Sequence, residues 1–410
     1  MNSVRSLFLA VILSTVFLNP GKSEDWSRWR GPDENGVARE TLPPDFDAEA
    51  LVWRAQVGVG FSSPVIVSGR LYTLGHDGSK PDGQETLWCL DAKTGEVVWS
   101  DSWPAPLLSN LHEGGPGATP TVANDRVFSL GKNGDLLCHE ATSGKVMWKR
   151  DLLADTGMKK APEWGFAGSP YLMEGQLIVE AGVTLSLDPK NGEILWRSQP
   201  FRPAYGTPVR FKVGEVERLA ILKTDGLVIL DPVNGGTVSF EPWETSFDTN
   251  ATTPIVSGAS IFVSTGYDRG CALFHFDGRT LNRRYENQSL CTHMNNAVLV
   301  DGHLYGFDGT AHRGRPTEFV CIEFESGKER WRVSPDEGLG CGSLISTSDG
   351  QLLILTEKGE LVVAPASPEG FRMLSRAQVL GGRCWTPPSF ADGLLYARNS
   401  RGDLVCVGRE

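Results

Sequence analysis

Short apolar runs alternate with polar turns along almost the whole chain, and one phrase recurs in this pattern. It consists of a strand end, a five-residue polar turn and a second strand that closes on a large side chain, most often Trp and in the weakest copy Leu374, as in "LDAKTGEVVW", which ends at Trp99. The closing positions are residues 53, 99, 148, 196, 240, 285, 331 and 374. Their spacing of 43 to 49 residues predicts a repeated unit the size of a four-stranded propeller blade.

A second phrase opens each unit with an inner strand pair, as in "SSPVIVSGRLYTL" from residue 62. Eight such pairs are each followed by a third strand, the last at 404–407, but eight fourth strands exist only if the strand around Trp53 supplies one. The pattern therefore predicts an all-β, eight-bladed β-propeller of four-stranded antiparallel blades, with the last blade closed by the N-terminal strand. A ring of seven blades with a loose end is the alternative.

The residues of the recurring turn have structural roles. An acidic side chain four residues before a glycine can accept local backbone N–H groups, and the glycine can adopt positive φ without steric cost. The closing Trp is expected to pack against the neighbouring blade. The acidic residues are Asp91, Glu140, Asp188, Asp231 and Glu323. We interpret these positions as builders of the fold and not as a cofactor site.

The Asp-x-x-x-Gly-x-x-x-Trp phrase resembles the repeat of the pyrroloquinoline-quinone (PQQ) propeller family, which includes quinoprotein alcohol dehydrogenases and BamB-like assembly scaffolds. The opening "DWSRWRGPDENGV" and the closing "CWTPPSFADGLLYARNSRGDLVCV" resemble secreted bacterial PQQ-like propeller proteins of the BamB-like kind. The resemblance covers about residues 25–410. It implies the propeller fold, but it leaves the function open because enzymes and scaffolds share the repeat.

The N-terminus has the pattern of an export signal. Arg5 precedes the apolar run at 7–18, and a polar stretch follows. Twelve apolar residues are too few to span a bilayer. We therefore expect a signal peptide at 1–23, a propeller domain at 24–410, no membrane span, and a periplasmic or secreted protein. The first cysteine is Cys89, so a lipid-anchoring cysteine is not expected.

The charge of the chain limits the class of partner. The formal net charge is −11, and it becomes −13 without residues 1–23, which carry Arg5 and Lys22. A protein of this charge repels polyanions, so nucleic acid is excluded as an expected partner. An envelope protein or an extracellular polymer is expected instead.

Eight cysteines raise the question of disulfides in an oxidising compartment. Four of them occupy the same third-strand position in different blades, and we interpret these as small packing residues. Cys341 and Cys384 each precede the inner strand of adjacent blades and are candidates for a disulfide. Cys271 and Cys291 form a second candidate pair.

Candidate binding residues gather at one mouth of the predicted channel. The long connections at 75–86, 102–117, 159–168 and 307–318 should share one face, because the other connections are uniformly short. Residues before the inner strands also ring this mouth. The candidates are His112, Glu113, Trp164, Tyr205, His293, Asn295, Asn296, Arg383 and Trp385. The alternative is that these residues only cap the channel and join neighbouring blades.

Two classes of function compete. A quinoprotein dehydrogenase, as the resemblance implies, needs PQQ against adjacent cysteines and Ca²⁺ on carboxylate and amide oxygens. The chain has no Cys-Cys pair, and it contains neither H-E-x-x-H nor G-x-S-x-G. We therefore expect a non-catalytic exported propeller without a cofactor, which binds a protein, peptide or polymer on its long-loop face. PQQ and Ca²⁺ belong to the alternative alone.

Overall fold

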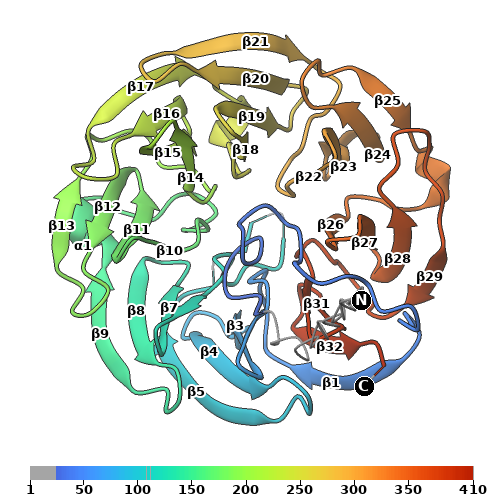
Figure 1. Cartoon of the computed structure of the whole chain (residues 1–410). Helices are drawn as coiled ribbons and strands as arrows, with labels where there is room; N and C mark the ends of the chain where they lie inside the picture. Colours follow the sequence, from blue (N-terminus) through green and yellow to red (C-terminus); the bar gives the residue numbers. More distant parts are fainter. Residues whose placement is uncertain (1–24, 108, 111, 410) are drawn as a thin grey trace, which may run out of the picture.

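The computed structural model is a closed ring of β-sheets around a central channel (Figure 1). It describes residues 25–107, 109–110 and 112–409, so the expected signal peptide at 1–23 lies outside the described residues. Eight sheets of four antiparallel strands follow one another around the ring. The eight-bladed prediction is confirmed, and the seven-bladed alternative is wrong.

Each blade runs from an inner strand at the channel to an outer strand at the rim. Blade 1 comprises β2 (Val65–Val67), β3 (Arg70–His76), β4 (Gln84–Asp91) and β5 (Val97–Pro104). Blade 2 comprises β6 (Thr121–Ala123), β7 (Arg126–Leu130), β8 (Asp135–Glu140) and β9 (Val146–Asp151). Blade 3 comprises β10 (Tyr171–Met173), β11 (Gln176–Ala181), β12 (Val183–Leu187) and β13 (Ile194–Arg197). Blade 4 comprises β14 (Val209–Val213), β15 (Val216–Lys223), β16 (Gly226–Leu230) and β17 (Thr237–Pro242).

The second half of the ring repeats this order. Blade 5 comprises β18 (Ile255–Ser257), β19 (Ser260–Thr265), β20 (Gly270–Phe276) and β21 (Leu281–Asn287). Blade 6 comprises β22 (Val298–Val300), β23 (His303–Thr310), β24 (Arg313–Glu323) and β25 (Glu329–Arg332). Blade 7 comprises β26 (Ser343–Ser346), β27 (Gln351–Leu355), β28 (Glu360–Pro365) and β29 (Ser375–Gln378). Blade 8 comprises β30 (Ser389–Ala391), β31 (Leu394–Arg398), β32 (Asp403–Val407) and β1 (Leu51–Gln56).

Among residues 25–107, 109–110 and 112–409, helical structure is confined to short connections. The helices are α1 (Leu152–Thr156), η1 (Ser246–Asp248) and η2 (Pro335–Glu337). Asp151 caps α1 because its side chain accepts hydrogen bonds from two backbone N–H groups of the first turn. Over the described part of the chain, none of the helices has the length and apolarity needed to cross a membrane.

Blade 8 is split between the two ends of the chain, as the sequence predicts. Strand β1 lies outside β32 at the rim (Figure 1), with Trp53 opposite Cys406 and Gln56 opposite Asp403. The backbone N–H of Gly408 donates to Ala50 at 2.9 Å, just beyond the paired segment. The N-terminal strand therefore covers an edge that would otherwise be open, and it closes the ring.

The recurring turn and its Trp are halves of one contact between blades. The Trp53 ring lies over Gly95 of the next blade, where an added Cβ would come within 2.6 Å of the ring. The Trp53 indole N–H donates to the carbonyl of Ala92 at 2.9 Å. Gly95 also has a φ of 73°. Glycine is therefore required twice at this position, once by the backbone conformation and once by the neighbouring ring. Trp99 makes the same contact over Gly144.

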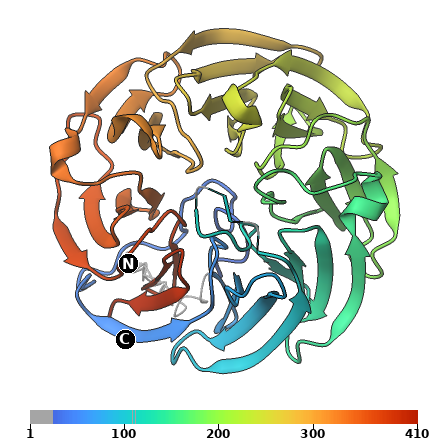
Figure 2. The same ribbon diagram turned by 180° about the vertical axis from the view of Figure 1, so that it is seen from behind.

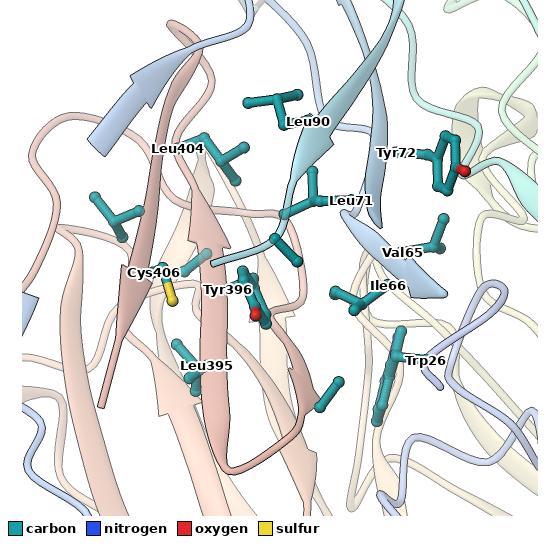
Figure 3. Close-up of a cluster of buried hydrophobic side chains, with 14 of the residues drawn as sticks. Trp26, Val65, Ile66, Leu71, Tyr72, Leu90, Leu395, Tyr396, Leu404 and Cys406 are labelled. Atoms are coloured by element: carbon teal, nitrogen blue, oxygen red, sulfur yellow. The ribbon is translucent and has the colours of Figure 1, made fainter. Parts of the chain in front are cut away.

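The largest apolar cluster lies where the split blade meets the first blade (Figure 3). Leu71 of β3 lies toward Tyr396 of β31, and Cys406 of β32 belongs to the same cluster of buried side chains. The closure of the ring is thus a packed interface and not only a set of backbone hydrogen bonds. Cys406 is a packing residue of this cluster, as predicted.

The predicted disulfide between Cys341 and Cys384 is not formed, because both are buried free thiols in the structure. They belong to different apolar clusters, Cys341 to a small one with Trp385 and Cys384 to the largest one. Burial raises the pKa of each thiol to about 12. Cys271 is also a free thiol, and its sulfur donates to the side chain of Asn287. Neither proposed pairing is therefore present.

Residues 25–40, which we call the channel plug, cross the ring on the side of the short turns. The plug lies at the ring centre in Figure 1, in dark blue. It bonds in turn to the inner parts of six blades. The contacts are Trp26 to Ile66, Ser27 to Val122, Arg28 to Leu172, Trp29 to Thr253, Arg30 to Ala297 and Ala38 to Ser346. The plug therefore closes one end of the channel and joins blades that are distant in sequence.

One of the predicted long loops is mostly strand. The segment 307–318 belongs to the long hairpin of β23 and β24, and only Ala311 and His312 separate the two strands. The connection at 159–168 is irregular, as expected. The connection after β5 begins at residue 105 and reaches toward the centre of the ring, as seen from behind in Figure 2.

Candidate functional site

A cavity of about 330 Å³, which we call the cup, occupies the channel on the long-loop side. Its walls include Phe61, Trp164, Tyr205 and Trp385, each of which precedes the inner strand of a blade. Trp29 of the channel plug contributes to the cup from the short-turn side. The cup is therefore an aromatic recess that is closed on one side by the N-terminal segment.

The structure brings six of the nine predicted site residues to the cup. These are His112, Trp164, Tyr205, His293, Asn295 and Trp385. The other three have different places. Glu113 and Arg383 form an ion pair with an N–O distance of 2.7 Å. Asn296 is buried and donates to the carbonyl of Thr253, so it joins blades 5 and 6. For Asn296 the capping alternative describes the structure better than the binding hypothesis.

Trp385 is a wall residue that is itself almost fully covered, with 3% of its surface exposed. Its ring stacks on Phe61 at 6.0 Å, and the guanidinium of Arg383 lies over it at 4.4 Å. Its indole N–H donates to the carboxylate of Glu357 at 3.2 Å. These contacts hold the ring in one orientation, so Trp385 shapes the cup as much as it offers a contact surface.

Trp164 and Tyr205 form the more open part of the aromatic wall. Both are half-buried, and their rings meet edge to face at 5.8 Å. They come from blades 3 and 4, so the pair spans a blade boundary. Burial raises the pKa of the Tyr205 hydroxyl to about 12. It therefore stays protonated at physiological pH and can donate a hydrogen bond to a ligand.

Two histidines face the cup as neutral rings. Burial lowers the pKa of His112 to about 3 and that of His293 to about 4. The Nδ1 atom of His112 accepts a hydrogen bond from the backbone N–H of Gly114 at 3.0 Å, which leaves the proton on Nε2. His293 has a buried Nδ1 with no hydrogen-bond partner among the described residues. The two rings therefore offer polar atoms without adding charge.

Several residues of the cup were not predicted. Phe61 and Tyr267 add aromatic walls, His312 lies edge-on to Trp385 at 4.9 Å, and Lys132 enters from the turn between β7 and β8. Phe61 precedes an inner strand like the residues that were chosen, so the same rule could have found it. Lys132 gave no such signal because its turn, "GKNG", is short.

The cup does not fit the quinone and Ca²⁺ site that the family resemblance implies. Ca²⁺ takes six to eight oxygen ligands, and carboxylates are prominent among them. The lining of the cup contains neither Asp nor Glu. Across the described residues, no three His, Cys, Asp or Glu side chains are arranged to hold a metal ion. We therefore derive no redox step through such a group.

Solved structures with the same ring share little sequence with this chain. BamB from Moraxella catarrhalis aligns with a TM-score of 0.61 at 14% identity, over 87% of this chain and 96% of that chain. The quinohemoprotein alcohol dehydrogenase from Comamonas testosteroni aligns with a TM-score of 0.66 at 12% identity, over 94% of this chain and 80% of that chain. At these identities the similarity shows the fold alone.

Sequence relatives fall into the same two groups. The outer membrane protein assembly factor BamB of Bordetella pertussis is 23% identical over 380 residues, or 87% of this chain and 86% of that protein. A polyvinylalcohol dehydrogenase of Sphingopyxis sp. is 24% identical over 207 residues, or 43% of this chain and 28% of that protein. A family model described as outer membrane protein assembly factor BamB matches residues 83–332, more than half of the chain. With its eight blades and recurring Trp contacts, the chain belongs to this family of PQQ-like β-propellers.

Proposed function

We propose that this chain is an exported, non-catalytic scaffold that binds an envelope protein through the cup. The observation that carries this proposal is the cup itself, an aromatic recess walled by residues of several blades and closed on one side by the channel plug. Partly exposed aromatic rings on a rigid frame are typical of binding hot spots. A cavity of about 330 Å³ has room for one or two side chains of a partner.

The relatives support a protein partner over a polymer. The similarity to the BamB of Bordetella pertussis extends over most of both chains, whereas the similarity to the polyvinylalcohol dehydrogenase covers less than half of this chain. A scaffold of this kind would act in the periplasm or at the outer membrane. The formal charge of −11 disfavours polyanionic polymers by repulsion.

Replacing Trp164 by Ala should weaken capture of the envelope partner about 30-fold, or ~2 kcal/mol. The reason is that Trp164 is half-buried at the open part of the wall, where a partner side chain would complete its burial. Pull-down from envelope extract would identify the partner, and titration with the purified partner would measure the affinity of each variant.

The matched control is Leu195→Ala, which also removes a partly exposed apolar side chain. Leu195 lies on the outer strand β13, 53% exposed and away from the cup. It should leave capture unchanged. Equal loss of capture in both variants, or none in either, would reject the cup as the binding site. Retention of an envelope polysaccharide in place of a protein would replace the protein partner with a polymer.

A PQQ-dependent dehydrogenase is the second candidate function, because the ring aligns with a quinohemoprotein alcohol dehydrogenase over 94% of this chain. Incubation with PQQ and Ca²⁺ should nevertheless give no alcohol- or sugar-dependent reduction of a dye. The physical reason is the missing carboxylate ligands in the cup. The check is an absorbance assay beside a known quinoprotein as the positive control. Turnover that depends on added PQQ would restore the enzyme function.

A further inference from the structure

Lys132 is a buried cation at the wall of the cup. It lies in the turn between β7 and β8 with 3% of its surface exposed, and it lines the cavity. Its aliphatic stem runs over Gly165, where an added Cβ would come within 2.1 Å of the Lys132 Cγ atom. Its backbone is fixed as well, because its carbonyl accepts from Phe166 at 2.8 Å. The position of this side chain is therefore built into the fold.

The ammonium group of Lys132 has no hydrogen bond or ion pair to the described residues, and this sets it apart. Three other cationic side chains are buried among the described residues, and each has hydrogen-bond partners. Lys223 donates to Glu180 at 2.7 Å, Arg30 to Asn35 at 2.7 Å and Arg398 to Leu74 at 2.6 Å. A buried charge without a partner is costly. Among the buried cations of the described residues, Lys132 is thus the exception, because the other three all donate hydrogen bonds.

The groups around Lys132 include one nearby carboxylate, Glu85, but it makes no direct bond to the ammonium. Glu85 of β4 is buried, and its carboxylate oxygens accept from the Lys132 backbone N–H at 3.1 Å and not from the side chain. Burial also raises the pKa of Glu85 to about 7. His112 and His293 are neutral because burial lowers the pKa of both rings. The cup therefore presents one cation among aromatic rings, and its lining offers no carboxylate.

We propose that the cup binds a carboxylate of its partner protein on the Lys132 ammonium, with an apolar or aromatic side chain of the same partner against the surrounding rings. This rests on the proposed function and names the chemistry that the partner must present. An ion pair in a recess partly enclosed by aromatic rings is stronger than one at the surface, and it would give the Lys132 ammonium a direct partner. The carboxylate can belong to an acidic side chain or to a chain terminus.

Three probes test this and distinguish the two sources of the carboxylate. N-acetylphenylalanine presents a terminal carboxylate beside an aromatic ring, and N-acetylphenylalaninamide has the same shape without the charge. The blocked dipeptide N-acetyl-Asp-Phe-amide presents a side-chain carboxylate. At pH 7 we expect at least one acid to bind ten-fold or more tightly than the neutral amide, measured by titration calorimetry. The acid that is preferred identifies the source.

Lys132→Met should abolish the preference for the acid and leave binding of the neutral amide unchanged. Methionine keeps an unbranched stem over Gly165 and removes only the charge. Lys160→Met is the matched control, because Lys160 is an exposed lysine in the connection between blades 2 and 3. The Lys160→Met variant should keep the full preference for the acid over the neutral amide. A second readout is reductive methylation followed by mass spectrometry, in which the bound acid should protect Lys132 and leave Lys160 reactive.

Three outcomes would overturn the proposal: equal affinity for acids and amide, a preference that survives in Lys132→Met, or no binding by any of the three probes. Lys132-dependent binding of polygalacturonate without binding of the probes would also overturn it, in favour of an acidic polymer. These failures differ from failure of the scaffold function. A chain that loses its partner in Trp164→Ala but binds acid and amide equally keeps the cup as the docking site and loses only the carboxylate.

Discussion

Deletion of residues 25–56 should leave the remaining chain unable to form a stable ring. The deletion removes β1, which pairs with β32 from Leu51 to Gln56, and it removes the plug contacts to six blades. Trp26 and Trp53 are both at most 8% exposed, and loss of a buried Trp typically costs ~3–5 kcal/mol. Two such losses approach the whole stability of a typical domain, ~5–15 kcal/mol. Circular dichroism and thermal melts would measure the result.

A rearranged chain provides the control for this deletion. The end of β32 lies beside the start of β1, since Gly408 bonds to Ala50. Residues 49–56 can therefore be attached after residue 409 through a short linker. This chain regains the eighth blade without the plug, so it should fold but melt below the full-length protein. A 25–56 deletion that melts like the full chain would contradict both the split blade and the role of the plug.

The fold could be predicted because its contacts are repeated. In four successive pairs of blades the outer Trp of one blade lies over the turn glycine of the next, as Trp53 does over Gly95, so these copies of the phrase carry the same information. The count of strands then required the N-terminal strand of blade 8. The channel plug has no counterpart in the repeats, and its bonds to the inner strands come from single residues such as Trp29 and Arg30. The repeat pattern of the sequence therefore gives no indication of the channel plug.

The site could be predicted only in outline. The rule that residues before inner strands ring the channel placed Trp164 and Tyr205 correctly at the cup. The same rule cannot tell whether a ring faces a ligand or packs, which depends on neighbours such as Phe61 and Arg383 around Trp385. It also cannot find Lys132. Lys132 is a candidate binding residue because its ammonium makes no direct bond to the described residues, and only the structure shows this.

Lys132→Met should stabilise the protein by about 2 kcal/mol at pH 7, although most core substitutions destabilise. Burial lowers the pKa of Lys132 from 10.5 to about 8. The difference between the two pKa values is equivalent to about 3 kcal/mol against the folded state when the group is protonated. Part of the stabilisation by Lys132→Met is offset. The Lys132 charge lowers the pKa of the buried Glu85 carboxyl, and the substitution removes this favourable interaction.

The effect should depend on pH in a defined window. Below about pH 8 Lys132 is protonated in both the folded and unfolded states, so the full cost is present. Between about pH 8 and 10.5 the folded state loses the proton first, so the unfolded state binds more protons and the stability of the wild type rises. Above pH 10.5 the cost is gone. Urea melts of both proteins at pH 7, 9 and 10.5 should therefore show a shrinking advantage of Lys132→Met.

Lys223→Met is the comparison variant for the stability change expected in Lys132→Met. Lys223 is equally buried, but it donates to Glu180, Gly182 and Thr184 at 2.7–2.9 Å. Its removal leaves the Glu180 carboxylate buried without its cation, so it should destabilise by ~3–5 kcal/mol. If Lys132→Met raises the free energy of unfolding and Lys223→Met lowers it, the charge of Lys132 costs folding stability. That cost is expected of a group that is kept to bind a ligand. Equal destabilisation would mean that the fold itself uses the Lys132 charge, and the carboxylate proposal would lose its physical basis.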